Sequence, residues 1–384
     1  MRTRAGEELL SAAERLAPDI LAVRDEIDRE RCLPPVLVEM MRTSGLFKLW
    51  LPRALGGPEL HPLEFIRVIE ALAKADGSVA WCATSASVFS LLAGHMQEPS
   101  ARAVFGADAV VAGSINPQGI VIPVDGGYLV SGRWAYASGI GHCDWVLGNC
   151  LLAEDDQPAR RGPREMRFVL MPKAAGTVFD AWNVSGLRGT GSHDFRVDEV
   201  FVPAGQTVPA FAVASVQAGT LYRMPPMSLF TIALASVSLG IARAAIEALV
   251  ELAAGKTPMG SAVLLREVPS AQAAVGKAEA LLRAARASVM QAVAEQWDEV
   301  AAAAPSLARR AGVKLATTFC ANACAQAVDA VHEAAGGSAL FESGRIARCW
   351  RDVHAATQHI GLSAGNYELA GRVLFGLDLG TPRF

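Results

Sequence analysis

The chain has 384 residues, of which 52% are hydrophobic and 19% charged, and its formal net charge is −3. This composition excludes an intrinsically disordered chain and predicts large buried surfaces, and no Lys/Arg stripe with interleaved aromatic residues suggests a nucleic-acid partner. The seven cysteines are irregularly spaced, which gives no disulfide framework and is typical of a protein of the reducing cytoplasm.

Residues 1–108 are predicted to form an N-terminal helical domain. The start of the chain, MRTRAGEELLSAAERLAPDI, lacks the apolar stretch of a signal peptide and has the pattern of an amphipathic helix. Residues 62–77 carry apolar side chains at helical spacing, and residues 78–96 are apolar on nearly every side. The second of these segments predicts a central, buried helix.

Residues 109–212 are predicted to form a small antiparallel β domain. The stretch 119–139 alternates around an Asp-Gly-Gly turn, which is a strong hairpin signal. Further short strands are expected in DWVLGNCLLA, RFVLMPK and DFRVDEVFVP, and long helical periodicity is missing from this region.

Residues 213–384 contain long alanine-rich segments of the length found in helical bundles. The uncharged run 224–242 is long enough to raise the question of a membrane span, but prolines and hydroxyl residues interrupt it. A helix buried in the bundle or in an oligomer interface is favoured. The sequence thus predicts an α+β protein of three domains, 1–108, 109–212 and 213–384.

Three motifs carry functional information: SGRWAYASG at 131–139, GLRGTGSHD at 186–194 and WRDVHAATQH at 350–359. Together with the order of the elements, they resemble the acyl-CoA dehydrogenase superfamily. The resemblance is closer to its branch of two-component flavin-dependent monooxygenases, which includes 4-hydroxyphenylacetate hydroxylase oxygenase components and dibenzothiophene monooxygenases. It covers nearly the whole chain and implies the acyl-CoA dehydrogenase-like fold, reduced FMN or FAD with O₂, and a homotetramer.

The resemblance assigns the first motif to the flavin. In the family this strand runs beside the isoalloxazine ring, the residue matching Ser138 donates a hydrogen bond at flavin N5, and the aromatic residue matching Tyr136 lies against the ring. Trp134 is taken as a further cofactor contact, and Ser114 and Asn116 align with the stretch at the pyrimidine edge of the flavin. Read by itself, the motif is also compatible with an ordinary strand whose aromatic residues pack before a turn.

His359 is the expected catalytic residue, together with Ser138. It lies at the spacing from Asp352 where the monooxygenase branch places an active-site histidine near flavin C4a. An imidazole there can hold a proton on a peroxide and act as an acid or base during oxygen transfer. A lone histidine on a helix is more often a core residue, so that alternative stays open. Arg351 and Asp352 are expected to brace or cap helices.

The substrate pocket is expected to include His95 and Trp81, because monooxygenases of this type line it with residues of the buried helix. His95 could equally be a polar residue that ends that helix. Arg188, in the glycine-rich motif, could meet a phosphate or a substrate, or it could face water.

The flavin phosphates are held in relatives by arginines of the C-terminal bundle and by a glycine-rich turn of a neighbouring subunit. Arg266 and the turn at Gly336 and Gly337 match these features loosely, since backbone N–H groups of such a turn can cradle phosphate. Arg266 is followed by Glu-Val-Pro, which departs from the R-x-x-F-G pattern of the dehydrogenases and leaves FMN and FAD both open.

A dehydrogenase would need a carboxylate base to remove an α-proton from a thioester. The superfamily places this base either on the late helix, where Ile360 stands here, or on an early helix of the C-terminal bundle, where the stretch 219–242 contains no Asp or Glu. Glu368 lies further along the chain and is off-register by two helical turns. No strand–GxGxxG–helix unit for NAD(P)H is found, so a separate NAD(P)H-dependent reductase must supply the reduced flavin.

The favoured interpretation is the oxygenase component of a two-component monooxygenase. It would form a C4a-hydroperoxyflavin and transfer one oxygen atom to an aromatic, heteroaromatic or polycyclic molecule, in the cytoplasm and without a metal. The first alternative is an FAD-dependent acyl-CoA dehydrogenase, and the second is a non-catalytic binding module on the same fold.

Overall fold

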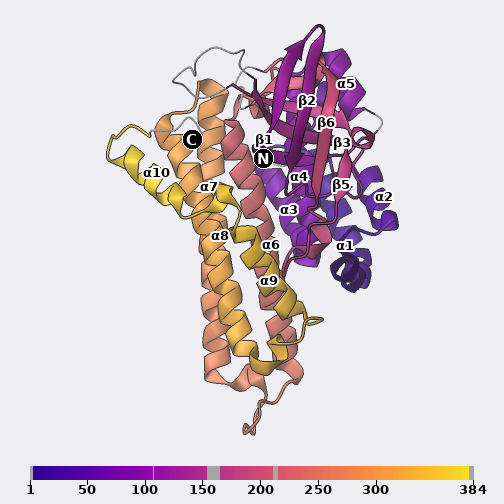
Figure 1. Ribbon diagram of the computed structural model, residues 1–384. Helices are drawn as coiled ribbons and strands as arrows, with labels where there is room; N and C mark the ends of the chain where they lie inside the picture. The colour runs from indigo at the N-terminus through magenta and orange to yellow at the C-terminus, as the bar shows by residue number, and fades with distance from the viewer. Residues whose placement is uncertain (1–2, 107, 154–164, 211–214, 380–384) are drawn as a thin grey trace.

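The computed structural model describes residues 3–106, 108–153, 165–210 and 215–379. Its helical N-terminal part covers one side of a β-sheet, and a bundle of long helices extends beyond both (Figure 1). The α+β arrangement predicted from the sequence, with N-terminal helices, a central sheet and a C-terminal helical bundle, is therefore the observed one. The N-terminal helices are α1 (Arg4–Glu30), α2 (Pro35–Thr43), α3 (Pro62–Ala75), α4 (Gly77–Ser90) and α5 (Glu98–Phe105).

Helix α4 is the central helix predicted from its apolar pattern, and nearly all of its residues are buried. It begins where it does because the carboxylate of Asp76 accepts the backbone N–H groups of Ser78 and Val79, at 2.8 and 3.1 Å, as an N-cap. Residues 77–95 and helix α6 (Pro226–Gly255) are both long and apolar enough to span a membrane, but most of their residues are buried inside the protein. Both are core helices.

Among the residues that the structure describes, the sheet has seven strands in the order β5-β6-β2-β1-β3-β4-β7. The predicted hairpin joins β1 to β2, with Gly126 of its turn at φ 75°. The strands are β1 (Val111–Val124), β2 (Gly127–Trp134), β3 (Trp145–Leu152), β4 (Met166–Pro172), β5 (Thr177–Phe179), β6 (Asp194–Pro203) and β7 (Thr207–Pro209).

The prediction of a purely antiparallel sheet is wrong for one pair of strands. β1 and β3 are parallel, with Val111 opposite Trp145. The chain reverses after β1 and again after β2, and β3 then pairs with β1 rather than with β2. Two reversals make β1 and β3 point the same way, so the sheet is mixed. Register shifts between Ser114 and Gly119 interrupt this parallel pairing.

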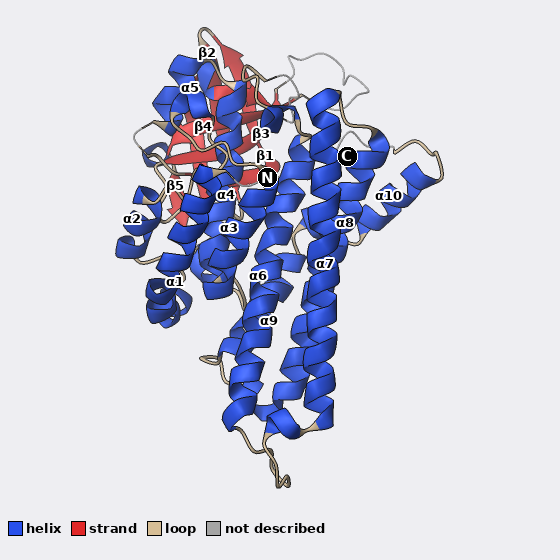
Figure 2. Ribbon diagram, turned by 180° about the vertical axis from the view of Figure 1, so that it is seen from behind, coloured by secondary structure: helices blue, strands red, loops and turns tan. Residues whose placement is uncertain are grey.

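The C-terminal helices form the bundle, and Figure 2 shows α6 to α9 running side by side. Helix α6 connects it to the N-terminal helices, since it packs against α3, α8 and α9. A Cβ at Gly240 of α6 would lie 2.4 Å from the carbonyl oxygen of Glu70, so only glycine permits this approach to α3. The helices are α6 (Pro226–Gly255), α7 (Pro269–Ala302), α8 (Leu307–Ala335), α9 (Arg345–Thr357) and α10 (Gly365–Leu374).

Candidate active site

A cavity of about 380 Å³ lies where the three parts of the fold meet. Its wall is built from α4, the irregular part of β1, the loop after β2, the segment between β5 and β6, the start of α6 and the end of α9. The side chains that line it are Trp81, Ser85, Phe89, Ser114, Ile115, Asn116, Tyr136, Ser138, Trp182, Leu187, Thr190, Ser192, Phe230, Leu234, Ala355, Gln358, His359 and Ile360. The sequence predictions for Ser138, Tyr136, Ser114, Asn116, Trp81 and His359 thus converge on one cavity.

A chain of hydrogen bonds runs along one wall of the cavity. The indole Nε1 of Trp81 donates to Ser138 Oγ at 3.1 Å, and this hydroxyl lies 2.7 Å from Ser192 Oγ. Ser192 Oγ is 2.6 Å from Thr190 Oγ1, which donates to the carbonyl oxygen of Leu187 at 2.8 Å. Thr190 and Ser192 were missed by the sequence reasoning, which looked to the charged residue of the GLRGTGSHD motif rather than to its two hydroxyls.

Two non-glycine residues of the wall have left-handed backbone conformations, Tyr136 with φ 66° and Leu187 with φ 52°. Such conformations cost about 1–3 kcal/mol each and are concentrated at functional sites. Tyr136 is 62% exposed as a residue, and its ring meets Trp182 edge-on, with 6.2 Å between centroids. The cavity therefore presents an uncovered aromatic surface next to its hydroxyl groups.

His359 lies just beyond the end of α9, where it caps the short helix η9 (Ile360–Leu362). Its Nδ1 accepts the backbone N–H of Gly361 at 3.0 Å, so the proton of the neutral ring is on Nε2. Burial lowers the pKa of His359 to about 4, which leaves the ring uncharged at neutral pH. Its centroid is 6.0 Å from that of Trp81 and 5.2 Å from that of Phe230. This arrangement favours a hydrogen-bond donor at Nε2 over the acid or base expected from the sequence.

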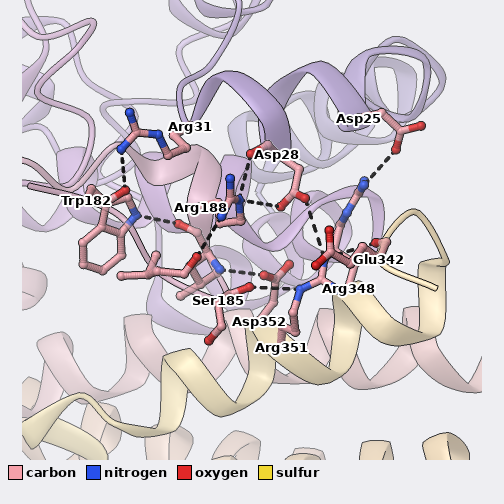
Figure 3. Close-up of polar contacts among 12 residues, drawn as sticks. Asp25, Asp28, Arg31, Trp182, Ser185, Arg188, Glu342, Arg348, Arg351 and Asp352 are labelled. Carbon is pink, nitrogen blue, oxygen red and sulfur yellow. Dashed lines mark hydrogen bonds and ion pairs between the residues drawn. The ribbon is translucent and has the colours of Figure 1, made fainter. Parts of the chain in front are cut away.

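Asp352 and Arg351 brace α9 against the loop that carries Leu187. Asp352 Oδ1 accepts the backbone N–H of Leu187 at 2.6 Å, and Arg351 Nε donates to the carbonyl of Ser185 at 2.9 Å (Figure 3). Burial, and then the nearby carboxyl of Asp76, raises the pKa of Asp352 above its usual range. The two residues therefore brace a helix, as expected from the sequence, and the loop that they hold forms part of the cavity wall.

Arg188 is turned away from the cavity, which corrects the expectation that it meets a phosphate or substrate. Its Nε donates to the carbonyl of Asp28 on α1 at 2.9 Å, and its Nη1 donates to the carbonyl of Val184 at 3.0 Å (Figure 3). The guanidinium therefore joins the loop to the N-terminal helix.

Trp134 does not reach the cavity either, so its assignment as a cofactor contact is corrected. It is fully buried, its Nε1 donates to the carbonyl of Asn149 at 2.8 Å, and it stacks on Phe195 with 4.9 Å between centroids. The indole has room because Gly119 carries no side chain; a Cβ at that position would lie 2.1 Å from the ring.

Arg266 and the turn of Gly336 and Gly337 lie at the other end of the bundle from the cavity. Arg266 follows the end of α6, whereas the cavity is at the start of that helix, beside Phe230. The glycine turn follows α8 at the same distant end (Figure 1). Within one chain, these residues and the cavity do not form a single site.

A second, smaller cavity of about 80 Å³ adjoins the first and contains His95. The two cavities share Phe89, Ile115 and Phe230 as lining residues. Apart from His95, the wall of the second cavity is almost entirely apolar; Tyr222 also lines it, and its hydroxyl donates to the carbonyl of Trp50 at 2.9 Å. His95 and Trp81 therefore line different cavities.

Comparison with known proteins identifies the family. Residues 3–98 match the family model described as acyl-CoA dehydrogenase, N-terminal domain, and residues 232–364 match acyl-CoA dehydrogenase, C-terminal domain. The chain is 30% identical over 355 residues to the indole-3-acetate monooxygenase of Pseudomonas putida, with 91% of this chain and 89% of that protein covered.

Two further similarities point to the same branch. The FADH2-dependent resorcinol hydroxylase, oxygenase component, of Rhizobium sp. (strain MTP-10005) is 30% identical over 376 residues, with 91% of this chain and 88% of that protein covered. The structure of XiaF from Streptomyces sp. in complex with FADH2 and glycerol matches with a TM-score of 0.90 at 26% identity, and covers 98% of this chain and 97% of that one. The chain belongs to the acyl-CoA dehydrogenase family, in its branch of flavin-dependent monooxygenases.

Proposed function

We propose that this chain is the oxygenase component of a two-component system that uses reduced flavin and O₂ to oxygenate a small aromatic molecule. The observation that carries the proposal is the composition of the cavity wall. It combines a chain of hydroxyls, an uncovered aromatic surface and a neutral histidine, and no Asp or Glu lines it among the residues that the structure describes.

The wall residues fit a flavin. The isoalloxazine ring needs a flat apolar surface and polar partners along its pyrimidine edge and at N5. Tyr136 and the 68% exposed Ile360 supply uncovered apolar surface, and Ser114 and Asn116 lie where the pairing of β1 is interrupted and supply polar groups. The hydrogen bond from Trp81 of α4 fixes the position of the Ser138 hydroxyl. When bound, a reduced flavin supplies the electrons that activate O₂.

The protein side chains orient the reactants and exclude water. His359 holds a proton on Nε2 and donates from that atom toward oxygen bound in the cavity, a form of stabilisation that is strong where water is excluded. Its low pKa keeps the ring in this neutral donor form across the physiological pH range.

The adjoining apolar cavity is the proposed substrate pocket. Its shared wall of Phe89, Ile115 and Phe230 puts a bound molecule next to the flavin cavity, and His95 offers a polar contact within it. A pocket of this kind favours a flat aromatic or heteroaromatic molecule with a hydroxyl or ring N–H that reaches the imidazole.

A dehydrogenase is disfavoured because the described cavity wall contains no carboxylate to remove an α-proton. The reduced flavin is proposed to come from a separate NAD(P)H-dependent reductase, since the sequence has no nicotinamide fingerprint. Comparison of FMNH₂ with FADH₂ binding distinguishes the two flavins.

We also propose a homotetramer in the cytoplasm. Leu340 and Phe341, which follow the turn at Gly336 and Gly337, are 77% and 69% exposed in the single chain. Packing of a second copy on this end of the bundle would cover them. It would also allow Arg266 and the glycine turn to serve the phosphates of a flavin held by a neighbouring copy.

The test is anaerobic loading of the protein with FMNH₂ or FADH₂, followed by stopped-flow mixing with O₂. The expected result is that oxidised flavin appears later from the protein-bound form than from free flavin, and that indole or resorcinol, as probes, are oxygenated. Flavin that oxidises as it does in free solution, with no probe oxygenated, would contradict the proposal. Bleaching of bound FAD by an acyl-CoA would show a dehydrogenase, and no flavin binding would show a binding module.

A further inference from the structure

We infer that Ser192 and Thr190 fix the direction of the hydrogen bonds along the cavity wall, so that Ser138 is an acceptor and the site selects reduced over oxidised flavin. The inference rests on the proposed function, because it concerns a flavin whose N5 meets Ser138. It assigns a positioning role to two residues that lie behind Ser138.

The ends of the chain of hydrogen bonds set its direction. The indole N–H of Trp81 can only donate, and the carbonyl oxygen of Leu187 can only accept. Between them lie the hydroxyls of Ser138, Ser192 and Thr190, each with one proton, at oxygen–oxygen distances of 2.7 and 2.6 Å. All four hydrogen bonds form only when each hydroxyl donates to the next residue toward Leu187.

The opposite direction forms fewer hydrogen bonds within the protein. Ser192 would then donate to Ser138, Thr190 would donate to Ser192, and the proton of Ser138 would point into the cavity. The bond from Thr190 to the Leu187 carbonyl would be lost, although that carbonyl also accepts from Trp182 Nε1 at 3.1 Å and from the Thr190 backbone at 3.2 Å. Ser192 and Thr190 are only 3% and 1% exposed, so water does not replace the hydrogen bond lost between Thr190 and the Leu187 carbonyl.

The favoured direction leaves Ser138 with a free lone pair and no free proton. Reduced flavin carries an N–H at N5, which can donate to that lone pair. Oxidised flavin has a bare nitrogen there, which needs a donor and obtains one only if the whole chain reverses. The reduced form thus gains one hydrogen bond relative to the oxidised form. One net hydrogen bond corresponds to roughly a threefold to tenfold difference in affinity.

This direction changes the role expected for Ser138 from the sequence, where it donates at N5. Removing the hydroxyl of Ser192 releases the Ser138 proton, which can then donate to oxidised flavin. Replacing Thr190 by the isosteric valine removes the acceptor of Ser192 and abolishes the fixed direction. A serine at position 190 keeps the hydroxyl and is the matched control.

The experiment measures the dissociation constants of the same flavin, oxidised and reduced, by anaerobic titration. Ser192→Ala and Thr190→Val should lower the ratio of oxidised to reduced dissociation constants by roughly threefold to tenfold, and Thr190→Ser should keep the wild-type ratio. A tenfold change corresponds to a decrease of about 30 mV in the two-electron potential of the bound flavin. Circular dichroism checks that each variant is folded.

An unchanged ratio in both Ser192→Ala and Thr190→Val would overturn the inference, as would a Thr190→Ser ratio that falls like that of Thr190→Val. If reduced flavin binds and supports oxygenation while the ratios stay constant, only this inference fails. If the wild-type protein binds neither form of flavin, the proposed function fails with it.

Discussion

Asp352 is expected to hold in place the loop that carries Leu187, Thr190 and Ser192. The replacement of Asp352 by alanine tests this expectation. The carboxylate accepts the backbone N–H of Leu187 at 2.6 Å, and Leu187 is 3% exposed. Without an acceptor, this buried N–H costs about 1–3 kcal/mol of folding stability. Because Leu187 is also held in a left-handed conformation, loss of the contact frees the loop to relax and displaces Thr190 and Ser192.

The assay compares Asp352→Ala with Asp352→Asn, which keeps an oxygen that can accept from Leu187. The alanine variant should unfold at lower denaturant concentration and bind reduced flavin more weakly, and the asparagine variant should retain both properties near pH 7. Wild-type stability and flavin affinity in the alanine variant would refute the idea that this contact holds the loop.

The pH dependence gives an independent check on the same residue. Burial and then Asp76 raise the pKa of Asp352 above its unfolded-state value. The contribution of this carboxyl to stability is therefore present at acidic pH and lost as the pH rises through the folded-state pKa. Asp352→Asn has no such proton to lose, so its stability relative to wild type should increase between about pH 5 and pH 8. A constant difference over this range would contradict the raised pKa.

Three further changes test the rest of the site. Ser138→Ala removes the partner proposed for N5–H and should weaken binding of reduced flavin by roughly threefold to tenfold in titration, whereas unaltered affinity would place the flavin elsewhere. His359→Ala should release more H₂O₂ per substrate oxygenated, because the Nε2 donor is lost; equal coupling would remove His359 from the reaction. With a pKa lowered to about 4 by burial, His359 should add no step to the pH–rate profile between about pH 6 and pH 8. Phe230→Ala removes part of the wall between the two cavities, so it should raise the KM for aromatic probes more than it changes flavin affinity. A selective loss of flavin binding would contradict the placement of the substrate in the second cavity.

The architecture could be predicted because the local signals agree with it. Segments that are apolar on nearly every side or free of charged residues marked α4 and α6 as buried helices, and the Asp-Gly-Gly turn marked the hairpin of β1 and β2. The parallel pairing of β1 with β3 could not be predicted. The alternation of apolar and polar residues along a strand indicates which face of the strand is buried, but it does not indicate which strand pairs with it.

The site was predicted in part, and the errors have a common cause. Ser138 and His359 lie in the motifs that carry the resemblance, and both line one cavity. Arg188 lies in such a motif too, but its partner Asp28 is 160 residues away in the sequence, and only the folded chain shows that the guanidinium is already engaged. Thr190 and Ser192 have a role only through the geometry that joins them to Ser138, which a motif does not display.

We propose that this cavity uses reduced flavin to transfer one oxygen atom from O₂ to an aromatic molecule. The most direct measurement is a single turnover in which the protein, loaded anaerobically with reduced flavin and an aromatic probe, is mixed with ¹⁸O₂ and the product is analysed by mass spectrometry. One ¹⁸O atom is expected in the oxygenated product. Unlabelled probe, with all the ¹⁸O recovered as hydrogen peroxide, would contradict it.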